Sequence, residues 1–330
     1  MIDRPFLQLQ YGVNLHAQHV YDTYSPPDFT GFYPDPDANA IRETLARYTG
    51  VRPDMIMCGN GSDEVIDLYL RTYALQQPGL KVAVVPPNYY QYDAYGARVG
   101  CDIVKLNDDR SSITPAKLAA LGCMPSNSVI MLDSPSNPTG AITPRSVFIN
   151  LLSAGYRVFA DEAYVEFYGQ TVVDLIELFP EQLVVSRSLS KIAAMAGSRF
   201  GYMIAAPALV KAISRHKLYF NVTAESQARA AFALQHIDEF QKSVVVMRHI
   251  QQQTRALLAK NPRITLFSAL PMYLLFTHQK YESEALQAIL REQYGIEVYL
   301  YKGFNDHEVL RATVGGQEAM RRLVAALEEL

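Results

Sequence analysis

The feature that most constrains the fold is a regular alternation of short apolar runs with longer amphipathic segments. Seven runs rich in β-branched and aliphatic residues lie at 55–58, 81–85, 102–106, 128–133, 156–161, 183–188 and 200–206. Helix-length segments, such as 40–48 and 64–75, lie between most of them. An alternation of this length predicts an α/β fold with a mainly parallel sheet that helices cover on both faces.

The pattern changes near residue 220, which predicts a second domain. A long helical stretch at 224–260 is followed by strand candidates at 264–267, 272–277, 296–300 and 309–314, and by helices at 283–293 and 317–329. We therefore expect a large parallel-sheet domain at 31–220 and, at 221–330, a connecting helix with a smaller α+β domain. The opening segment, 1–30, reads as an arm that packs on the small domain.

Composition excludes several classes of function. The formal net charge is −3 and no long basic run occurs, which argues against nucleic acid or an acidic membrane surface as a partner. No uninterrupted apolar run is long enough to span a membrane, and the opening residues lack the apolar core of a secretory signal. Three irregularly spaced cysteines suit reduced thiols in a cytoplasm, and the histidines show no metal-ligand spacing, so no metal is expected.

Polar segments directly follow most of the predicted strands. They lie at 59–64, 86–90, 134–140, 161–164 and 188–191, and Arg199 comes eight residues after Lys191. Open parallel sheets bind ligands beyond the carboxyl ends of their strands. These loops are therefore expected to meet at one edge of the sheet and to form one site.

Together these segments resemble the fold-type I pyridoxal-5′-phosphate (PLP) enzymes, and within them the histidinol-phosphate aminotransferase-like group of class I/II aminotransferases. The matching pieces are YPDP (33–36), GNGSDE (59–64), the Pro–Asn–Tyr of 87–89, SNPTG (136–140), DEAYVEF (161–167), SLSKIAAMAGSRFGY (188–202) and LRATVG (310–315). They occur in the family's order from about residue 31 to the C-terminus. The resemblance implies a PLP-dependent transferase fold with a large and a small domain.

The resemblance also implies roles around the cofactor ring. Lys191 would hold PLP as a covalent aldimine and, once substrate displaces it, move a proton as a general acid and base. Asp161 would keep a proton on the pyridine nitrogen in a charge-assisted pair. Tyr164 and Asn137 match the donors to the ring's phenolic oxygen, and Tyr89 matches the aromatic residue that stacks on the ring.

The phosphate of the cofactor needs donors that recognise an anion. A turn before a helix would point backbone amides at it. The residues that match the family's phosphate cup are Gly61, Ser62, Asp63, Ser188, Ser190 and Arg199. Tyr33 matches a tyrosine that reaches the phosphate of the neighbouring subunit, so the resemblance implies a homodimer with shared sites.

The substrate half of the site departs from the family. Arg311 matches the arginine that grips the substrate α-carboxylate. However, Tyr299 stands where the family places an arginine near the substrate phosphate, and Asn14 begins a segment that lacks the proline of the family's Asn–Glu–Asn–Pro motif. These departures argue against histidinol phosphate as substrate. The tyrosines and methionines nearby favour an aromatic or other uncharged side chain.

Three hypotheses follow, and the first two make the protein an enzyme of amino acid metabolism. The first is ping-pong transfer of an amino group between an α-amino acid, or related amine, and a 2-oxo acid. The second keeps PLP but changes the reaction to decarboxylation or elimination, because a fold does not determine a reaction class. The third is a non-catalytic PLP-fold protein. Each residue alone also has a structural explanation; Asp161 could cap a helix and Arg199 could form a surface ion pair.

Overall fold

The chain is described from a computed structural model that covers residues 7–12, 14–28, 31–304 and 307–330. Its largest element is a seven-stranded sheet in the order β2-β8-β7-β6-β5-β3-β4. The strands are β2 (Ile56–Asn60), β3 (Lys81–Val84), β4 (Asp102–Lys105), β5 (Ser128–Asp133), β6 (Arg157–Asp161), β7 (Leu183–Ser188) and β8 (Phe200–Ala205). The two pairs that β8 makes, with β2 and β7, are antiparallel and the other four pairs are parallel, so the prediction of a mainly parallel α/β sheet is confirmed.

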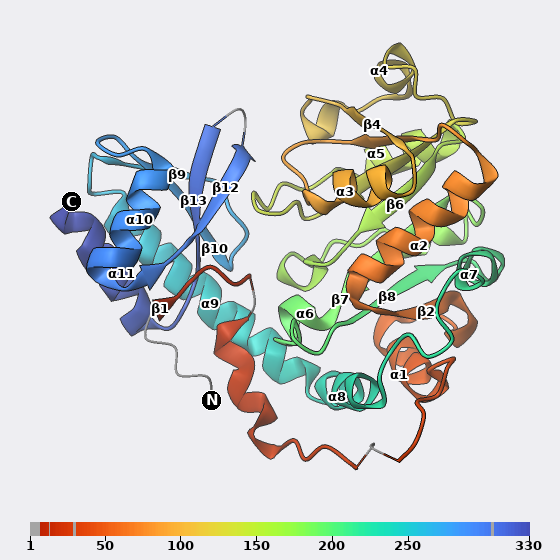
Figure 1. Cartoon of the computed structure of the whole chain (residues 1–330), viewed down its shortest axis with the longest axis horizontal. Coiled ribbons are helices and arrows are strands. Elements are labelled where there is room, and N and C mark those ends of the chain that lie inside the picture. The colour runs from red at the N-terminus through yellow and green to blue at the C-terminus, as the bar shows by residue number, and fades with distance from the viewer. Residues whose placement is uncertain (1–6, 13, 29–30, 305–306) are drawn as a thin grey trace.

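Helices cover both faces of this sheet (Figure 1). Along β5, Val129 and Met131 face a core that includes α2 (Gly61–Gln76), α3 (Gln91–Arg98) and α7 (Pro207–Ser214). Ile130 and Leu132 face the opposite core, which includes α1 (Asn39–Thr49), α4 (Pro115–Ala120) and α5 (Arg145–Ser153). Successive side chains of a strand point to opposite faces, so a strand buried on both sides is a continuous apolar run.

A second, four-stranded antiparallel sheet has the order β12-β13-β10-β9. Its strands are β9 (Ile264–Phe267), β10 (Tyr273–His278), β12 (Tyr299–Phe304) and β13 (His307–Thr313). Helices α10 (Ser283–Tyr294) and α11 (Gln317–Glu329) belong to the same part of the chain. The strand predicted at 296–300 is instead divided, because β11 (Ile296–Glu297) pairs with β1 (Leu7–Gln8) while β12 pairs with β13.

The N-terminal segment runs from β1, which pairs with β11, toward α1 of the large sheet (Figure 1). After β1 it forms a 3-10 helix, η1 (Leu15–Thr23), which contacts α9 (Ile237–Leu258). Residues 1–6, 13 and 29–30 of the predicted arm lie outside the described residues. The other 3-10 helices are η2 (Pro53–Met55), η3 (Arg110–Ser112), η4 (Val165–Phe167) and η5 (Val173–Ile176).

The prediction of one connecting helix at 224–260 is wrong. The segment forms α8 (Ala224–Gln235) and α9 (Ile237–Leu258), with a break at His236, whose φ is −110° and ψ is 21°. The backbone N–H of His236 closes α8. Asp238 and Glu239 then occupy the first turn of α9, where acidic side chains stabilise a new helix N-terminus.

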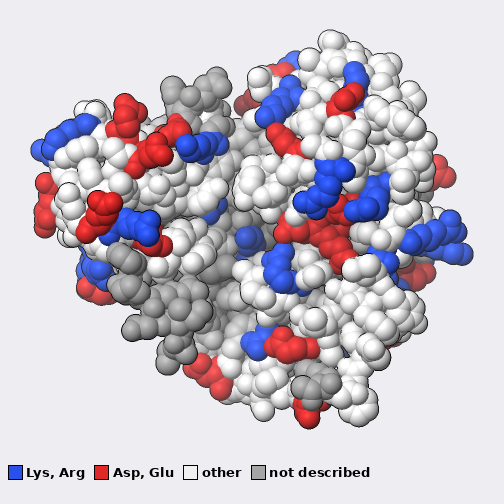
Figure 2. Space-filling model, viewed as in Figure 1, with Lys and Arg blue, Asp and Glu red and all other residues white. Residues whose placement is uncertain are grey.

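The surface is hollowed between the part that carries the four-stranded sheet and the part that carries the seven-stranded sheet (Figure 2). On the face shown, acidic and basic side chains lie side by side. Within the described ranges, the structure has no helix with both the length and the apolar character needed to cross a bilayer.

Candidate active site

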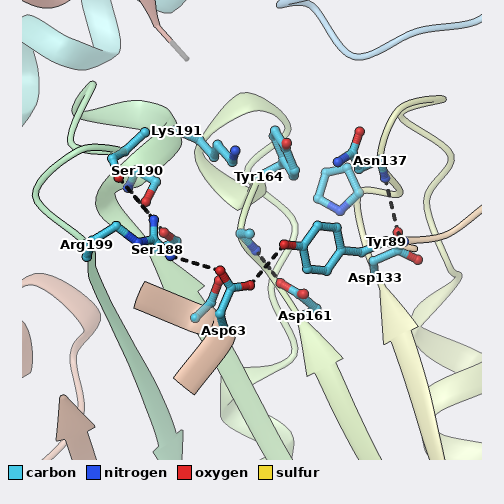
Figure 3. A pocket seen from close by; sticks show the side chains of 14 residues that line it. Asp63, Tyr89, Asp133, Asn137, Asp161, Tyr164, Ser188, Ser190, Lys191 and Arg199 are labelled. Carbon is cyan, nitrogen blue, oxygen red and sulfur yellow. Dashed lines mark hydrogen bonds and ion pairs between the residues drawn. The ribbon is translucent and has the colours of Figure 1, made fainter. Parts of the chain in front are cut away.

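Most of the residues predicted for the cofactor meet in one pocket at the carboxyl ends of β5, β6 and β7 (Figure 3). Strands β5 and β6 are in parallel register, with Asp133 opposite Asp161, and Asp161 is in turn opposite Ser186 of β7. Parallel strands therefore deliver their following loops to the same edge. Ten predicted residues line the pocket: Ser62, Asp63, Tyr89, Asn137, Asp161, Tyr164, Ser188, Ser190, Lys191 and Arg199.

The floor of the pocket carries a buried carboxylate, Asp161. Its oxygens accept hydrogen bonds from the Tyr92 hydroxyl at 2.7 Å and from the Ala163 N–H at 3.0 Å. Burial raises the pKa of Asp161 to about 7, and the neighbouring charge of Asp133 acts in the same direction. No ion pair of Asp161 is found among the described residues. A cation placed against Asp161 would therefore restore its ionised form.

The opposite end of the pocket has the character of an anion site. Gly61 begins the 16-residue helix α2. The first backbone N–H groups of a helix have no acceptor within the helix and can bind an anion. Arg199 lies beside this turn, and its Nη2 is 2.8 Å from the Asp63 carboxylate. The Tyr89 hydroxyl donates to the other Asp63 oxygen at 2.9 Å. A cationic fork, helix amides and nearby serine hydroxyls are suitable donors for a phosphate.

Gly61 and Gly201 permit this close approach. Gly61 has a φ of +75°, and a Cβ there would lie 2.4 Å from Arg199 Nη2. On β8, a Cβ at Gly201 would lie 2.3 Å from the backbone nitrogen of Ser62. A larger residue at Gly61 would displace the Arg199 guanidinium, and a larger residue at Gly201 would push the helix turn away from the sheet.

Lys191 enters the pocket from the short helix α6 (Leu189–Ile192). Its Nζ donates to the backbone oxygen of Gly12 at 3.2 Å and lies 5.6 Å from the centre of the Tyr164 ring. The Tyr164 hydroxyl is 3.1 Å from that of Tyr273, and burial raises the pKa of Tyr164. Ser188 caps α6 through the Ser190 N–H at 3.2 Å, which orients the segment that presents the lysine.

Arg311 lies between two tyrosine rings of the four-stranded sheet. Its guanidinium carbon is 4.5 Å from the ring centre of Tyr273 and 4.6 Å from that of Tyr299. Tyr299 is directly opposite Arg311 on the neighbouring strand, which explains the contact. One nitrogen donates to the Gln10 backbone oxygen at 3.1 Å, whereas Nε is buried without a hydrogen-bond partner. Part of this buried cation therefore lacks a compensating acceptor.

Five predicted residues do not line this pocket: Gly61, Tyr299, Arg311, Asn14 and Tyr33. Asn14 is buried, and its amide donates to the Ile192 backbone oxygen at 2.9 Å and to the Ser243 hydroxyl at 2.7 Å. It thereby joins the N-terminal segment and α9 to the residue that follows Lys191. Tyr33 is 83% exposed and stacks on Phe220, with the ring centres 4.7 Å apart.

Three residues near the site were not predicted from the sequence: Tyr92, Arg110 and Asp133. Asp133 ends an otherwise apolar strand, as Asp161 does, and that position was a usable signal. Tyr92 belongs to a tyrosine-rich stretch, and Arg110 lies in a polar stretch 23 residues before Asp133. No local pattern distinguishes these two, because only the fold brings them to the site.

The site fits PLP. The buried carboxylate suits the pyridinium nitrogen, the anion site suits the phosphate, and the lysine suits covalent attachment to the aldehyde. Asn137 lines the same pocket with a side-chain amide, whose nitrogen can donate to the phenolic oxygen of the ring. Within the described ranges there is no cluster of three or more metal-ligating side chains. Fold and site together define the class of fold-type I PLP enzymes.

Comparisons with known proteins define the family. The model of class I and II aminotransferases matches residues 28–327. The histidinol-phosphate aminotransferase of Desulfitobacterium hafniense is 32% identical in an alignment 314 residues long, which covers 90% of this chain and 83% of that protein. The chain therefore belongs to the class I and II aminotransferases, which depend on PLP, and it is an enzyme of that type.

Solved structures agree on the fold. The histidinol-phosphate aminotransferase of Sinorhizobium meliloti, in complex with PLP, superposes with a TM-score of 0.82 at 20% identity, over 98% of this chain and 90% of that one. The L-threonine-O-3-phosphate decarboxylase of Porphyromonas gingivalis has a TM-score of 0.82 at 19% identity, over 98% of both chains. An aminotransferase and a decarboxylase thus share this fold.

Proposed function

We propose that this aminotransferase moves the amino group of an α-amino acid with an uncharged side chain to a 2-oxo acid, and that Lys191 is its catalytic residue. The observation that carries the proposal is the convergence of Lys191, Asp161 and Arg199 on one pocket. A basic amine, a buried acid and an anion site there match the aldehyde, the ring nitrogen and the phosphate of PLP.

Bound PLP would supply an electron sink for the bond that breaks at the substrate Cα. Lys191 would hold the cofactor until substrate arrives, and its freed amine would then carry a proton between the substrate Cα and the cofactor. Asp161, held by Tyr92 and the Ala163 amide, would keep the ring nitrogen protonated. Tyr164 and Asn137 would bind the phenolic oxygen of the ring.

Recognition of the substrate carboxylate is assigned to Arg311. Its buried Nε lacks a partner, and a planar carboxylate can accept from a guanidinium in a bidentate manner. The flanking rings of Tyr273 and Tyr299 restrict the rotation of the guanidinium and exclude water from its faces.

The substrate side chain is proposed to be uncharged, with aromatic amino acids preferred. Tyr299 supplies an aromatic face where the resembling family has an arginine for a phosphate. The nearby cation Lys302 pairs with Glu308 at 3.3 Å and is largely exposed, so it does not replace that arginine. Asn14 would act indirectly, by holding the segment after Lys191.

We also propose a cytoplasmic homodimer in which Tyr33 reaches the phosphate of the partner's cofactor. Phe32, Tyr33, Tyr219 and Phe220 form an exposed aromatic patch, which is typical of an interaction surface. Reduced thiols support the location, since Cys58, Cys101 and Cys123 are all free and buried.

The visible absorption spectrum of the holoenzyme tests the activity. Aromatic amino acids should convert the band of the lysine-bound cofactor to the amino form, and a 2-oxo acid should restore it. Lys191→Ala should abolish turnover, and Lys191→Arg, which retains the charge, should not rescue it. Release of carbon dioxide without an acceptor would establish a decarboxylase instead. If no amino acid changes the band, the proposal is wrong.

A further inference from the structure

A buried ion pair lies behind the cofactor pocket, between Arg110 of η3 and Asp133 at the end of β5. Arg110 Nη2 is 2.7 Å from Asp133 Oδ1, and the two side chains are only 7% and 5% exposed. Removing two charges from water is unfavourable by several kcal/mol per ion unless further hydrogen bonds compensate. The remaining contacts of the pair therefore indicate what it does.

Arg110 connects the ends of two strands. Its Nη1 donates to the backbone oxygen of Asp133 at 2.8 Å. The two hydrogens of Nη2 are shared among four close acceptors, which include the backbone oxygens of Val85 at 2.9 Å and Pro87 at 2.8 Å. The Ser136 hydroxyl is 3.0 Å away. One guanidinium thus joins the loop after β3 to the loop after β5.

Asp133 continues this connection into the pocket. Its Oδ2 accepts hydrogen bonds from the backbone N–H of Tyr89 at 3.2 Å and of Asn137 at 3.1 Å, and the second is drawn in Figure 3. Tyr89 and Asn137 belong to the two loops that Arg110 joins, and both line the cofactor pocket. A single carboxylate therefore determines the separation of these two backbone positions.

The charge of Arg110 has a second consequence. Asp133 and Asp161 are register partners on adjacent strands, so two carboxylates lie side by side at the floor of the pocket. Asp133 already has a cationic partner, because Arg110 Nη2 pairs with its Oδ1, whereas the two loop amides bind its Oδ2. Asp161 is thereby left as the carboxylate that can pair with a cationic ligand, without competition from its neighbour.

We propose that Arg110 and Asp133 are positioning residues that fix the ring of Tyr89 and the side chain of Asn137 in place before the cofactor binds. This inference rests on the proposed roles of Tyr89 and Asn137 toward PLP. The pair does not touch reacting atoms. It acts through the two loops, and its loss should loosen the cofactor more than the fold.

A matched control is formed by Arg187 of β7 and Glu162, which directly follows β6. Arg187 and Glu162 form a second buried pair, with 2.9 Å between Nη2 and Oε2 and exposures of 9% and 2%. Their other hydrogen bonds go to Thr171 and to the backbone of Val172, neither of which lines the pocket. Arg187→Met therefore removes a comparable buried charge without releasing the two loops.

The experiment compares Arg110→Met with Arg187→Met at a temperature at which both are folded by far-UV circular dichroism. PLP affinity, the circular dichroism of the bound cofactor, kcat and KM are measured. Arg110→Met should bind PLP about tenfold or more weaker than Arg187→Met, with reduced cofactor dichroism and with kcat falling more than KM changes. Arg110→Lys should recover only part of the PLP affinity and of kcat, because an ammonium cannot reach all the acceptors of the guanidinium.

Two results overturn the inference. One is a PLP affinity and kcat of Arg110→Met within about twofold of those of Arg187→Met. The other is full recovery by Arg110→Lys. If Arg110→Met does not fold, Asp133→Asn is measured in the same way, with the same expectation and the same refutation. Failure of the unaltered protein to bind PLP would instead refute the proposed function, and this inference with it.

Discussion

Replacement of Gly61 by alanine tests the geometry of the phosphate site most directly. An added Cβ would lie 2.4 Å from Nη2 and 3.0 Å from Cζ of Arg199, both closer than real contacts allow. The obstructed atoms are the far end of a flexible side chain, so the guanidinium can rotate away. It would then lose its bonds to the Asp63 carboxylate at 2.8 Å and to the Ala196 backbone oxygen at 3.0 Å.

The magnitude has two parts. An alanine at a φ of +75° is destabilised by about 1–2 kcal/mol through backbone strain alone. A hydrogen bond to a charged group is worth about 1.5–3 kcal/mol, so loss of the Arg199 contact should weaken cofactor binding by about 10- to 100-fold. Gly50→Ala isolates the backbone strain from the loss of the Arg199 contact. The φ of Gly50 is +74°, and a Cβ there would meet nothing within 4 Å.

The assay titrates apoprotein of Gly61→Ala and Gly50→Ala with PLP and, separately, with pyridoxal, which lacks the phosphate. Both variants should lose similar stability to urea. Only Gly61→Ala should lose affinity for PLP, and its affinity for pyridoxal should remain that of Gly50→Ala. Equal PLP affinity of the two variants, or an equal loss toward both ligands, would refute the assignment of Arg199 to the phosphate.

Three further predictions concern other parts of the molecule. Burial raises the pKa of Glu166 from 4.5 to about 7, so between these pH values the folded state retains a proton that the unfolded state has lost. The free energy of unfolding should therefore fall as pH rises from 4.5 to 7, and Glu166→Gln should remove up to about 3 kcal/mol of that fall in urea unfolding. An unchanged pH profile of the variant would contradict the burial argument. Tyr33→Ala should weaken PLP binding about tenfold at concentrations where sedimentation still shows a dimer, and unchanged affinity would remove Tyr33 from the partner's site. Tyr299→Arg should raise kcat/KM for phosphorylated amino acids relative to aromatic ones by about tenfold. An unchanged ratio would show that Tyr299 does not determine substrate specificity.

Much of the fold was predictable from local patterns. The runs at 128–133 and 183–188 are strands over those residues, and the helix predicted at 317–329 has the same bounds. Such elements are encoded by alternation and length, which a single segment carries within itself. Most of the residues proposed for the cofactor stood out because they lie in segments that directly follow strands, and parallel strands bring their carboxyl ends together. Arg199 and Tyr33 were indicated by the family resemblance instead.

The prediction failed where one segment has two partners. The strand predicted at 296–300 is divided because its halves join different sheets, and the predicted connecting helix breaks at His236 where a new N-terminus begins. Periodicity records only whether a segment is apolar on one side. It contains no information about which neighbour covers that side.

By itself, therefore, the sequence determined most of the elements and the class of fold, and it indicated the residues that are proposed to hold the cofactor. The tertiary structure alone decided the contacts between residues far apart in the chain. It placed Arg110 against Asp133, Asn14 beneath the lysine segment, and Arg311 between two tyrosine rings. The physical reason is that these contacts depend on strand order and on the packing of whole elements, whereas a sequence pattern reports only the local preference of each residue.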